Sequence, residues 1–246
     1  MATLPDNPAA RLLAILKDGK TKDPKAPSRK VWHELLKVSE GDHVLLMTRL
    51  AQVMALPTII AVEVLEHHPD EGQTVSHWRS QISGAFVNLN LNAPWESFIG
   101  AIDQHSLSYP NITAKLLHHI TRIKPADTES LTITRDQIQD LINEINSSEI
   151  DSEIKITLVR YLVNLINAID EYFITGAIPI LDASNVIFGN LVVDPKYREF
   201  IKTHSLGQKV LSIVSLATNA VTIAVSLPQL TQAFTSSLAH LSGHGS

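Results

Sequence analysis

The spacing of apolar residues along the chain is helical from one end to the other. Near the N-terminus, Asn7 and Pro8 form a helix start signal, because a capping side chain precedes a proline at the first helical position. The apolar positions that follow recur every three to four residues, and the same pattern returns along the rest of the chain. The sequence therefore predicts an all-α fold, a multi-helix bundle of about ten helices.

Capping and helix-breaking residues predict where several of these helices begin and end. Ser28 is expected to cap the second helix, and Thr134 with Gln137 forms a capping-box pattern at the start of a later one. Pro57 is expected to break or kink the preceding helix, because proline lacks an amide N–H and its ring clashes with the previous turn. The pattern also predicts a helix over 94–104.

The longest predicted helix covers 153–175, and its few polar positions step by three or four residues, at Arg160, Asn164, Asn167 and Glu171. Such a helix belongs in the middle of a bundle, and Gly176 is its natural C-terminal stop. Residues 177–193 are open between helix and strand, because paired valine and isoleucine residues also suit a strand. A helix over 180–191 is preferred, since a lone strand would have no partner.

Composition divides the chain into an ordinary body and an unusual tail. The 246 residues are 44% hydrophobic and 18% charged, and there is no cysteine, which excludes disulfides, thiolate zinc sites and thiol nucleophiles. All 45 Lys, Arg, Asp and Glu side chains lie within the first 209 residues. We therefore expect an N-terminal helical unit over 1–124, a central helical unit over 133–205 and a C-terminal tail over 206–246 that is charge-free after Lys209.

The tail contains an uncharged stretch, 210–227, that is long enough for a membrane-spanning helix. As a helix it would be about 27 Å long, close to the roughly 30 Å thickness of a bilayer's hydrocarbon core. Small polar residues recur along it and fall within one arc of the helix. We call this stripe the seam, and it consists of Ser212, Ser215, Thr218, Asn219, Thr222 and Ser226.

Three interpretations of the seam stay open. In a soluble bundle, its hydroxyls would bond back to carbonyls of the same helix or meet neighbouring helices. In a membrane, the seam would join several copies of the helix or line a water-filled path, and a single copy would insert only marginally. A helix lying in the plane of the membrane interface fits less well, because such helices usually carry Lys or Arg on the polar face.

The N-terminal region is basic. Residues 1–38 carry eight basic and four acidic side chains, and a candidate basic patch consists of Lys20, Lys22, Lys25, Arg29 and Lys30. Such a patch could meet a phosphate-rich or acidic partner. A solvated loop is the preferred interpretation, because Pro24 and Pro27 interrupt the run and Trp32 alone could stack on a base. Nucleic acid is therefore not an expected partner.

The sequence offers little enzyme chemistry. Its eleven histidines include the pairs His67–His68 and His118–His119, but adjacent side chains on a helix point about 100° apart and suit a single metal ion poorly. The zincin motif, the phosphate-binding loop, the nucleophile elbow and the dinucleotide-binding fingerprint are all absent from the sequence. We expect no metal and no cofactor.

One pair of residues resembles a known catalytic signature. Arg198 is followed, after five intervening residues, by His204, and this spacing resembles the signature of the HEPN ribonucleases, an all-helical family. The resemblance implies RNA cleavage in which Arg198 and His204 polarise the phosphodiester and transfer protons to the leaving oxygen.

The leading functional expectation is a non-enzymatic helical interaction protein. It would bind a protein partner or itself, and its C-terminal helix would engage a membrane or an oligomer core, most concretely as a bacterial effector or toxin-like component. The alternatives are a soluble adaptor, inhibitor or immunity protein with the tail buried as core, and a HEPN-like ribonuclease. The first residues lack the pattern of a secretory signal, so we expect a cytoplasmic protein, with membrane association through the tail as a variant.

Overall fold

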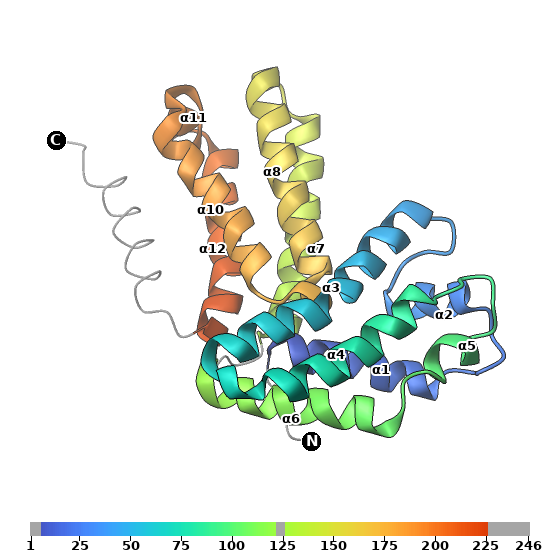
Figure 1. The fold of residues 1–246 in the computed structure, drawn as a ribbon. Coiled ribbons are helices and arrows are strands. Elements are labelled where there is room, and N and C mark those ends of the chain that lie inside the picture. Colours follow the sequence, from blue (N-terminus) through green and yellow to red (C-terminus); the bar gives the residue numbers. More distant parts are fainter. Residues whose placement is uncertain (1–5, 122–125, 226–246) are drawn as a thin grey trace. The chain divides into compact units, whose positions relative to one another are not determined.

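The computed structural model describes residues 6–121 and 126–225, and these residues form α-helices without a β-strand. They contain twelve α-helices and one short 3-10 helix, which confirms the predicted all-α multi-helix fold (Figure 1). The chain divides into two compact units, Met1–Arg122 and Ile123–Ser246. The described part of the predicted tail, 206–225, lies in helix α12 (Ser205–Val225), which packs against other helices of the second unit.

The first unit is built around α1 and α3. α1 packs against α6 and α3, and α3 packs in turn against α4. The elements of this unit are α1 (Pro8–Thr21), α2 (Ser28–Leu35), α3 (His43–His67), the 3-10 helix η1 (Pro69–Glu71), α4 (Gly72–Val87), α5 (Glu96–Ile99) and α6 (Gln104–Thr121).

The side chain of Asn7 caps α1 as predicted. Its Oδ1 accepts a hydrogen bond from the backbone N–H of Ala10 at 3.0 Å, and its Nδ2 donates to the carbonyl of Ala114 in α6 at 2.8 Å. Asn7 is 1% exposed, so both bonds lie away from water. One residue therefore begins α1 and fixes it against α6.

The predicted cap of α2 is wrong. The residue at the N-cap position is Pro27, and the Ser28 hydroxyl instead donates to the carbonyl of Ala93 at 2.9 Å. The loop before α2 is paired with the segment before α5, where the N–H groups of Trp95 and Glu96 donate to the carbonyls of Ala26 and Pro24. The Ser28 hydroxyl is therefore bonded to a carbonyl that is distant in the sequence, and it does not cap α2.

The same pairing shortens the helix that was predicted over 94–104. Only Glu96–Ile99 is α-helical there, and α6 begins at Gln104, with Asp103 accepting from the N–H of Ser106 at 2.6 Å. The N–H groups of Trp95 and Glu96 are hydrogen-bonded to the loop before α2, so a continuous helix does not form across this stretch.

Aromatic residues fill the core of the first unit at this end. Trp32 lies 5.3 Å from Trp95 and 5.2 Å from Phe98, measured between ring centroids, and Phe86 lies 5.0 Å from Phe98. Near-perpendicular ring contacts such as that of Trp32 with Trp95 are favourable beyond the area they bury. The Nε1–H of Trp95 donates to the carbonyl of Gly19, which fastens the end of α1 to this cluster.

Of the two effects predicted for Pro57, a break or a kink, the break does not occur. The helix runs without interruption from His43 to His67 and contains Pro57 as a buried residue. Proline removes one backbone hydrogen bond, but the apolar positions continue in register beyond it, at Ile60, Ala61 and Val64, and are buried. Packing on both sides of the proline maintains the helix.

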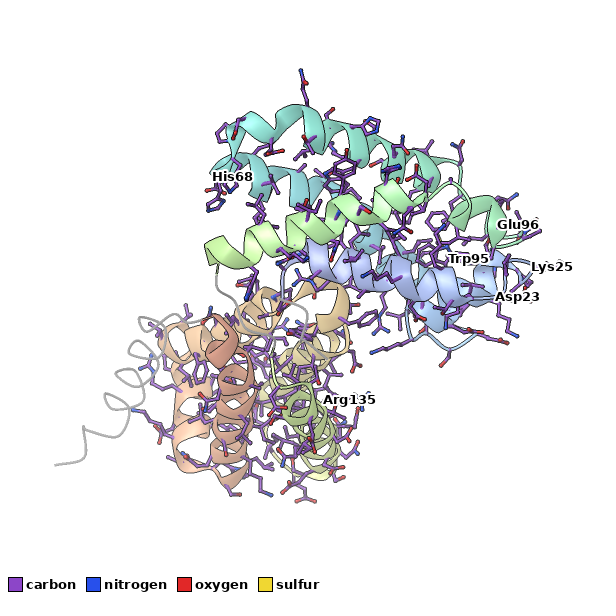
Figure 2. All side chains as sticks on the ribbon, turned by 90° about the horizontal axis from the view of Figure 1, so that it is seen from below. Asp23, Lys25, His68, Trp95, Glu96 and Arg135 are labelled. Atoms are coloured by element: carbon purple, nitrogen blue, oxygen red, sulfur yellow. The ribbon has the colours of Figure 1, made fainter. Side chains whose placement is uncertain are left out.

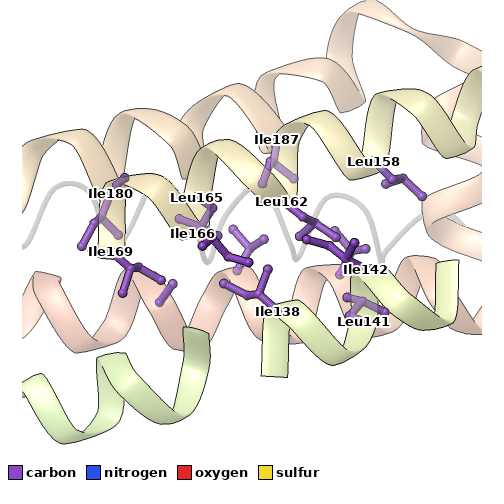
Figure 3. Close-up of a cluster of buried hydrophobic side chains, with 14 of the residues drawn as sticks. Ile138, Leu141, Ile142, Leu158, Leu162, Leu165, Ile166, Ile169, Ile180 and Ile187 are labelled. Atoms are coloured by element: carbon purple, nitrogen blue, oxygen red, sulfur yellow. The ribbon is translucent and has the colours of Figure 1, made fainter. Parts of the chain in front are cut away.

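The second unit is a bundle in which α7, α8, α10 and α12 run side by side (Figure 1). Its isoleucine and leucine side chains meet between these helices (Figure 3). The elements of this unit are α7 (Thr128–Ser147), α8 (Ser152–Asp170), α9 (Tyr172–Thr175), α10 (Ile178–Val193), α11 (Pro195–Thr203) and α12 (Ser205–Val225).

The predicted capping box is wrong, because α7 begins earlier. Asp127 is the N-cap and accepts from the N–H groups of Glu129 and Ser130, while Thr134 is buried inside the helix. The predicted long helix is divided at Glu171 into α8 and α9, and Gly176 ends α9 with φ of 78°, a conformation that suits glycine. α10 settles the ambiguous stretch as helix.

Candidate functional site

The seam on the C-terminal helix straddles the edge of the buried face of α12. The buried side chains are Leu206, Val210, Val214, Thr218 and several small residues around them. Thr218 donates to the carbonyl of Val214 at 2.8 Å, and Ser215, which is half-buried, donates to the carbonyl of Leu211 at 2.7 Å. These hydroxyls satisfy themselves within their own helix.

The remaining seam residues fall into two groups. Ser212 and Asn219 are exposed. The side chain of Thr222 and the whole of Ser226 lie outside the described residues. In its described part, α12 packs against α7, α10 and α11, and Lys209 forms an ion pair with Glu144 of α7 at 2.6 Å. This part of the helix is therefore core of the second unit.

The candidate basic patch is reduced to three available cations. The ammonium of Lys20 donates to the carbonyl of Ile99 at 2.7 Å, and burial lowers the pKa of this lysine. Lys22 forms ion pairs with Asp18 and Glu34. Lys25 and Lys30 are exposed, and Arg29 is half-exposed. Figure 2 shows Lys25 beside Asp23, at the end of the unit that also holds Trp95 and Glu96.

Arg198 and His204 hold helix ends together. The guanidinium of Arg198 donates from Nε to the carbonyl of Leu191 at 2.5 Å and from Nη2 to the carbonyl of Val192 at 2.8 Å. The ring of His204 stacks on Phe200 with centroids 4.7 Å apart, and its Nδ1 accepts from the N–H of Leu206. Both side chains make contacts that a purely structural role explains.

The described residues hold no group of three or more His, Cys, Asp or Glu side chains that could bind a metal ion. A groove of about 520 Å³ lies along α4 and α5 and is lined by His77, Ser80, Gln81, Asn88 and Ser97, together with small residues. Asn88 and Ser97 already donate to the carbonyls of Gly84 and Pro94. The lining contains no carboxylate or ammonium, and its one titratable side chain is the imidazole of His77.

The most unusual feature of the first unit is the outward side of α3. Helices of soluble proteins are normally apolar on the packed side and polar on the other, whereas α3 is apolar around its circumference. Val44 is 79% exposed, Val62 is 64% exposed and Met47 is 52% exposed. We call this surface the α3 face, and it consists of Val44, Met47, Ala51, Met54, Ala55, Thr58, Ile59, Val62 and Leu65.

The α3 face carries no charge over most of its length. The one charged residue of α3 between Val44 and Val62 is Arg49, which is buried and donates to the carbonyls of Leu36 and Lys37 at 2.9 and 3.1 Å. Arg49 thus fixes the start of α3 against the end of α2 and leaves the outward side uncharged. At the far end Glu63 is half-buried, and burial raises the pKa of its carboxyl.

Among the described residues, α3 is the one helix long and apolar enough to cross a membrane by length and composition. In its most apolar window of 18 residues, 44% are buried within the protein. The core helix of a soluble protein meets the same two criteria.

No protein-family model, curated protein or solved structure matches this chain.

The sequence pattern did not single out the α3 face. Its signal was present, because apolar residues occupy all sides of 43–67 and such a helix is expected to be fully covered. Because a break was expected at Pro57, this segment was predicted as two shorter helices, and the full length of the α3 face was not predicted. Which side is left uncovered depends on the neighbouring helices, which no local pattern gives.

Proposed function

We propose that this protein is a non-enzymatic helical interaction protein that binds the apolar surface of a protein partner through the α3 face. The observation that carries the proposal is a long exposed helix face, uncharged from Val44 to Val62, on a helix whose other side is packed. Large exposed apolar patches on soluble domains usually mark interaction sites, because leaving them in water costs free energy.

The shape and charge of the α3 face favour a protein over a lipid surface or a small substrate. Helices that lie on anionic membranes usually present Lys or Arg beside the apolar face, and the α3 face has neither. Small ligands bind in concave pockets that bury most of their surface, whereas a helix face is convex. The apolar side chains of another helix fit such a surface.

The expectation of a membrane-entering C-terminal helix stays a prediction, as do the effector and toxin-like roles. The contacts of α12 with α7, α10 and α11 support the alternative of a soluble adaptor, inhibitor or immunity protein with its C-terminal helix as core. The α3 face suits that alternative, because such proteins act by covering part of a partner.

The proposal is tested with a photo-crosslinking amino acid placed on the α3 face. The variant replaces Met54, which is 42% exposed, and the matched control replaces Ile156, which lies on α8 of the second unit and is 68% exposed. Both proteins are expressed at natural levels in the source cells, irradiated and analysed by mass spectrometry. We expect discrete protein adducts from position 54 and few from position 156. Equal adducts at both positions, or none at position 54, would contradict the proposal.

A further inference from the structure

We infer that the occupant of the α3 face is the α3 face of a second copy of this chain, packed antiparallel in a weak, reversible dimer. The inference rests on the proposed function and names its partner. Three observations carry it: the spacing of the exposed residues, the small side chains at the middle, and the charges at the two ends of α3.

The exposed residues of the α3 face have the spacing found where two helices pair in a coiled coil. Val44, Met47, Ala51, Met54 and Thr58 are separated by steps of three, four, three and four. This alternation keeps one stripe of side chains facing a partner helix, where each side chain enters a gap between four others. Val62 and Leu65 extend the stripe by about two further turns. The surface is thus suited to another helix along about 32 Å of its length.

The middle of the stripe allows two helices to approach closely. Ala51 and Ala55 are exposed there and project little beyond the backbone, while Met47 and Met54 lie beside them. Helix axes in such contacts are about 8–10 Å apart, and small residues favour the shorter distance. Methionine fills irregular gaps because its unbranched side chain adapts to its neighbours. A stripe of this kind can meet its own copy without a clash.

The charged residues at the ends of α3 select the antiparallel orientation. If Val44 lies level with Leu65 of the second copy, His43 lies level with Glu66 of the second copy and Asp42 with His67 of the second copy. Each acidic residue then meets a histidine, and the two helix dipoles oppose each other. In a parallel pair, Glu66 would face Glu66 of the second copy and the dipoles would add, which is unfavourable.

The size of the α3 face sets the strength of the dimer. A strip about 32 Å long and about 10 Å wide covers roughly 320 Å² on each copy, or about 640 Å² in total. Stable dimers usually bury more than about 1,200 Å², so the expected complex is reversible and depends on concentration. A two-fold contact uses the same surface on both copies, and an uncharged stripe satisfies this condition without like-charge repulsion.

The first experiment measures the mass of the full chain by sedimentation velocity over a range of concentrations. The double variant Met47→Lys with Met54→Lys should stay monomeric where the unchanged protein dimerises. The matched control is Ile156→Lys with Val163→Lys on α8, which has the same spacing of seven residues and comparable exposure, and it should dimerise like the unchanged protein. A Met54→Lys protein mixed with a Met54→Glu protein should recover the dimer, which a folding defect could not do.

The second experiment determines the orientation. The chain has no cysteine, so each single-cysteine variant carries one thiol. With a short bismaleimide, Met54→Cys should give covalent dimers, because the antiparallel register brings position 54 near its own copy, whereas Val44→Cys alone should not. Mixing Val44→Cys with Leu65→Cys should restore linking. Equal linking at 44 and 54 would overturn the antiparallel orientation.

The two proposals fail in different ways. A chain that is monomeric at every concentration tested, or a dimer unaffected by the lysine substitutions on α3, would overturn the inferred second copy. If photo-crosslinking at position 54 nevertheless gave adducts with other proteins, the proposed function would stand and its partner would be a different chain. Binding of the full chain to neutral phosphatidylcholine vesicles that is abolished by the same lysine substitutions would assign the face to a lipid surface and overturn both.

Discussion

At the scale of single residues, two glycines in the second unit report how closely its helices pack. A Cβ atom added to Gly207 would lie 2.5 Å from the Cα of Ile201 and 2.7 Å from the carbonyl oxygen of Phe200. Both neighbours are backbone atoms and cannot turn aside. Gly189, in α10, has nothing within 4 Å of the corresponding position. The first glycine is required by the approach of α11 to α12, and the second is not.

We therefore expect opposite effects when each glycine is replaced by alanine. Gly207→Ala should destabilise the second unit by about 2 kcal/mol or more, because the backbone of α11 must move. Gly189→Ala should stabilise it by about 0.5–1 kcal/mol, since alanine loses less conformational entropy than glycine in a helix. Urea unfolding followed by circular dichroism, with hydrogen exchange over α10 to α12, measures both. Equal effects would contradict the packing described for Gly207.

Single residues also show what the sequence could predict. Asn7 was predicted as a cap because its side chain bonds to an N–H three residues away, and local sequence contains that information. Ser28 carried the same local signal, but its hydroxyl bonds to Ala93, which is 65 residues distant. A cap bond to a residue a few positions away can be predicted from the sequence. A competing hydrogen bond to a distant carbonyl can be predicted only when the fold is known.

At the scale of helices, the periodicity of apolar residues predicted the elements well and their outward faces poorly. The sequence left open whether the seam on α12 packs within a soluble bundle, meets other copies in a membrane or lies at a membrane interface. In the structure Ser212 and Asn219 are exposed, Thr218 is buried and the buried face is mainly apolar. A stripe of small polar residues can lie toward solvent or toward a neighbour with equal ease, because short hydroxyls satisfy themselves within the helix. The direction in which the stripe faces on α12 follows from the packing of the apolar side of this helix against the bundle.

The buried side of α12 can be tested against its seam. Val214 is fully buried and Asn219 is exposed. Val214→Asp should cost about 3–5 kcal/mol and unfold the second unit, because a carboxylate would be placed among apolar side chains. Asn219→Asp adds the same charge on the exposed side and should change stability by about 0.5 kcal/mol or less. Far-UV circular dichroism and urea midpoints distinguish the two, and a well-folded Val214→Asp protein would contradict the core role of α12.

Helix caps predict how the protein responds to acid. Hydrogen bonds from the hydroxyl and N–H of Ser130 hold the pKa of the Asp127 carboxyl below its ordinary value of 3.8. A carboxyl with a folded-state pKa below its unfolded value contributes stability above the unfolded pKa, and this contribution is lost as the pH falls through the folded pKa. Asp103 and Asp151 also have lowered pKa values, the first through the N–H of Ser106 and the second mainly through Lys196.

Asp127→Asn separates the charge of this cap from its hydrogen bonds, since asparagine also caps helices. The variant should be less stable than the unchanged protein at about pH 6, and the difference should narrow below about pH 4, where the carboxyl of the unchanged protein becomes protonated. Urea midpoints measured across this range test the expectation. A difference that does not change with pH would show that the lowered pKa of Asp127 contributes nothing to stability.

At the scale of the whole molecule, charge is distributed unevenly. Residues 126–225 contain 13 Asp and Glu against 7 Lys and Arg, while residues 6–121 contain 12 against 11. Charge sums of this kind, like the charge-free stretch after Lys209, can be read directly from the sequence because they are counts of residue types. The sequence alone could not locate the α3 face, because the exposure of Met47 or Val62 follows from how α1, α4 and α6 pack on the other side of α3.

The uncharged nature of the α3 face gives a final prediction about assembly. A dimer held by apolar side chains should keep its dissociation constant within about twofold when NaCl is raised from about 50 mM to about 500 mM, because salt screens charges and leaves apolar contacts intact. Contacts through Lys25 and Lys30 on an acidic surface would weaken about tenfold or more over the same range. Sedimentation velocity on the full chain measures the constant. A steep salt dependence that Met47→Lys with Met54→Lys leaves unchanged would assign the interface to the basic residues around the start of α2 and not to α3.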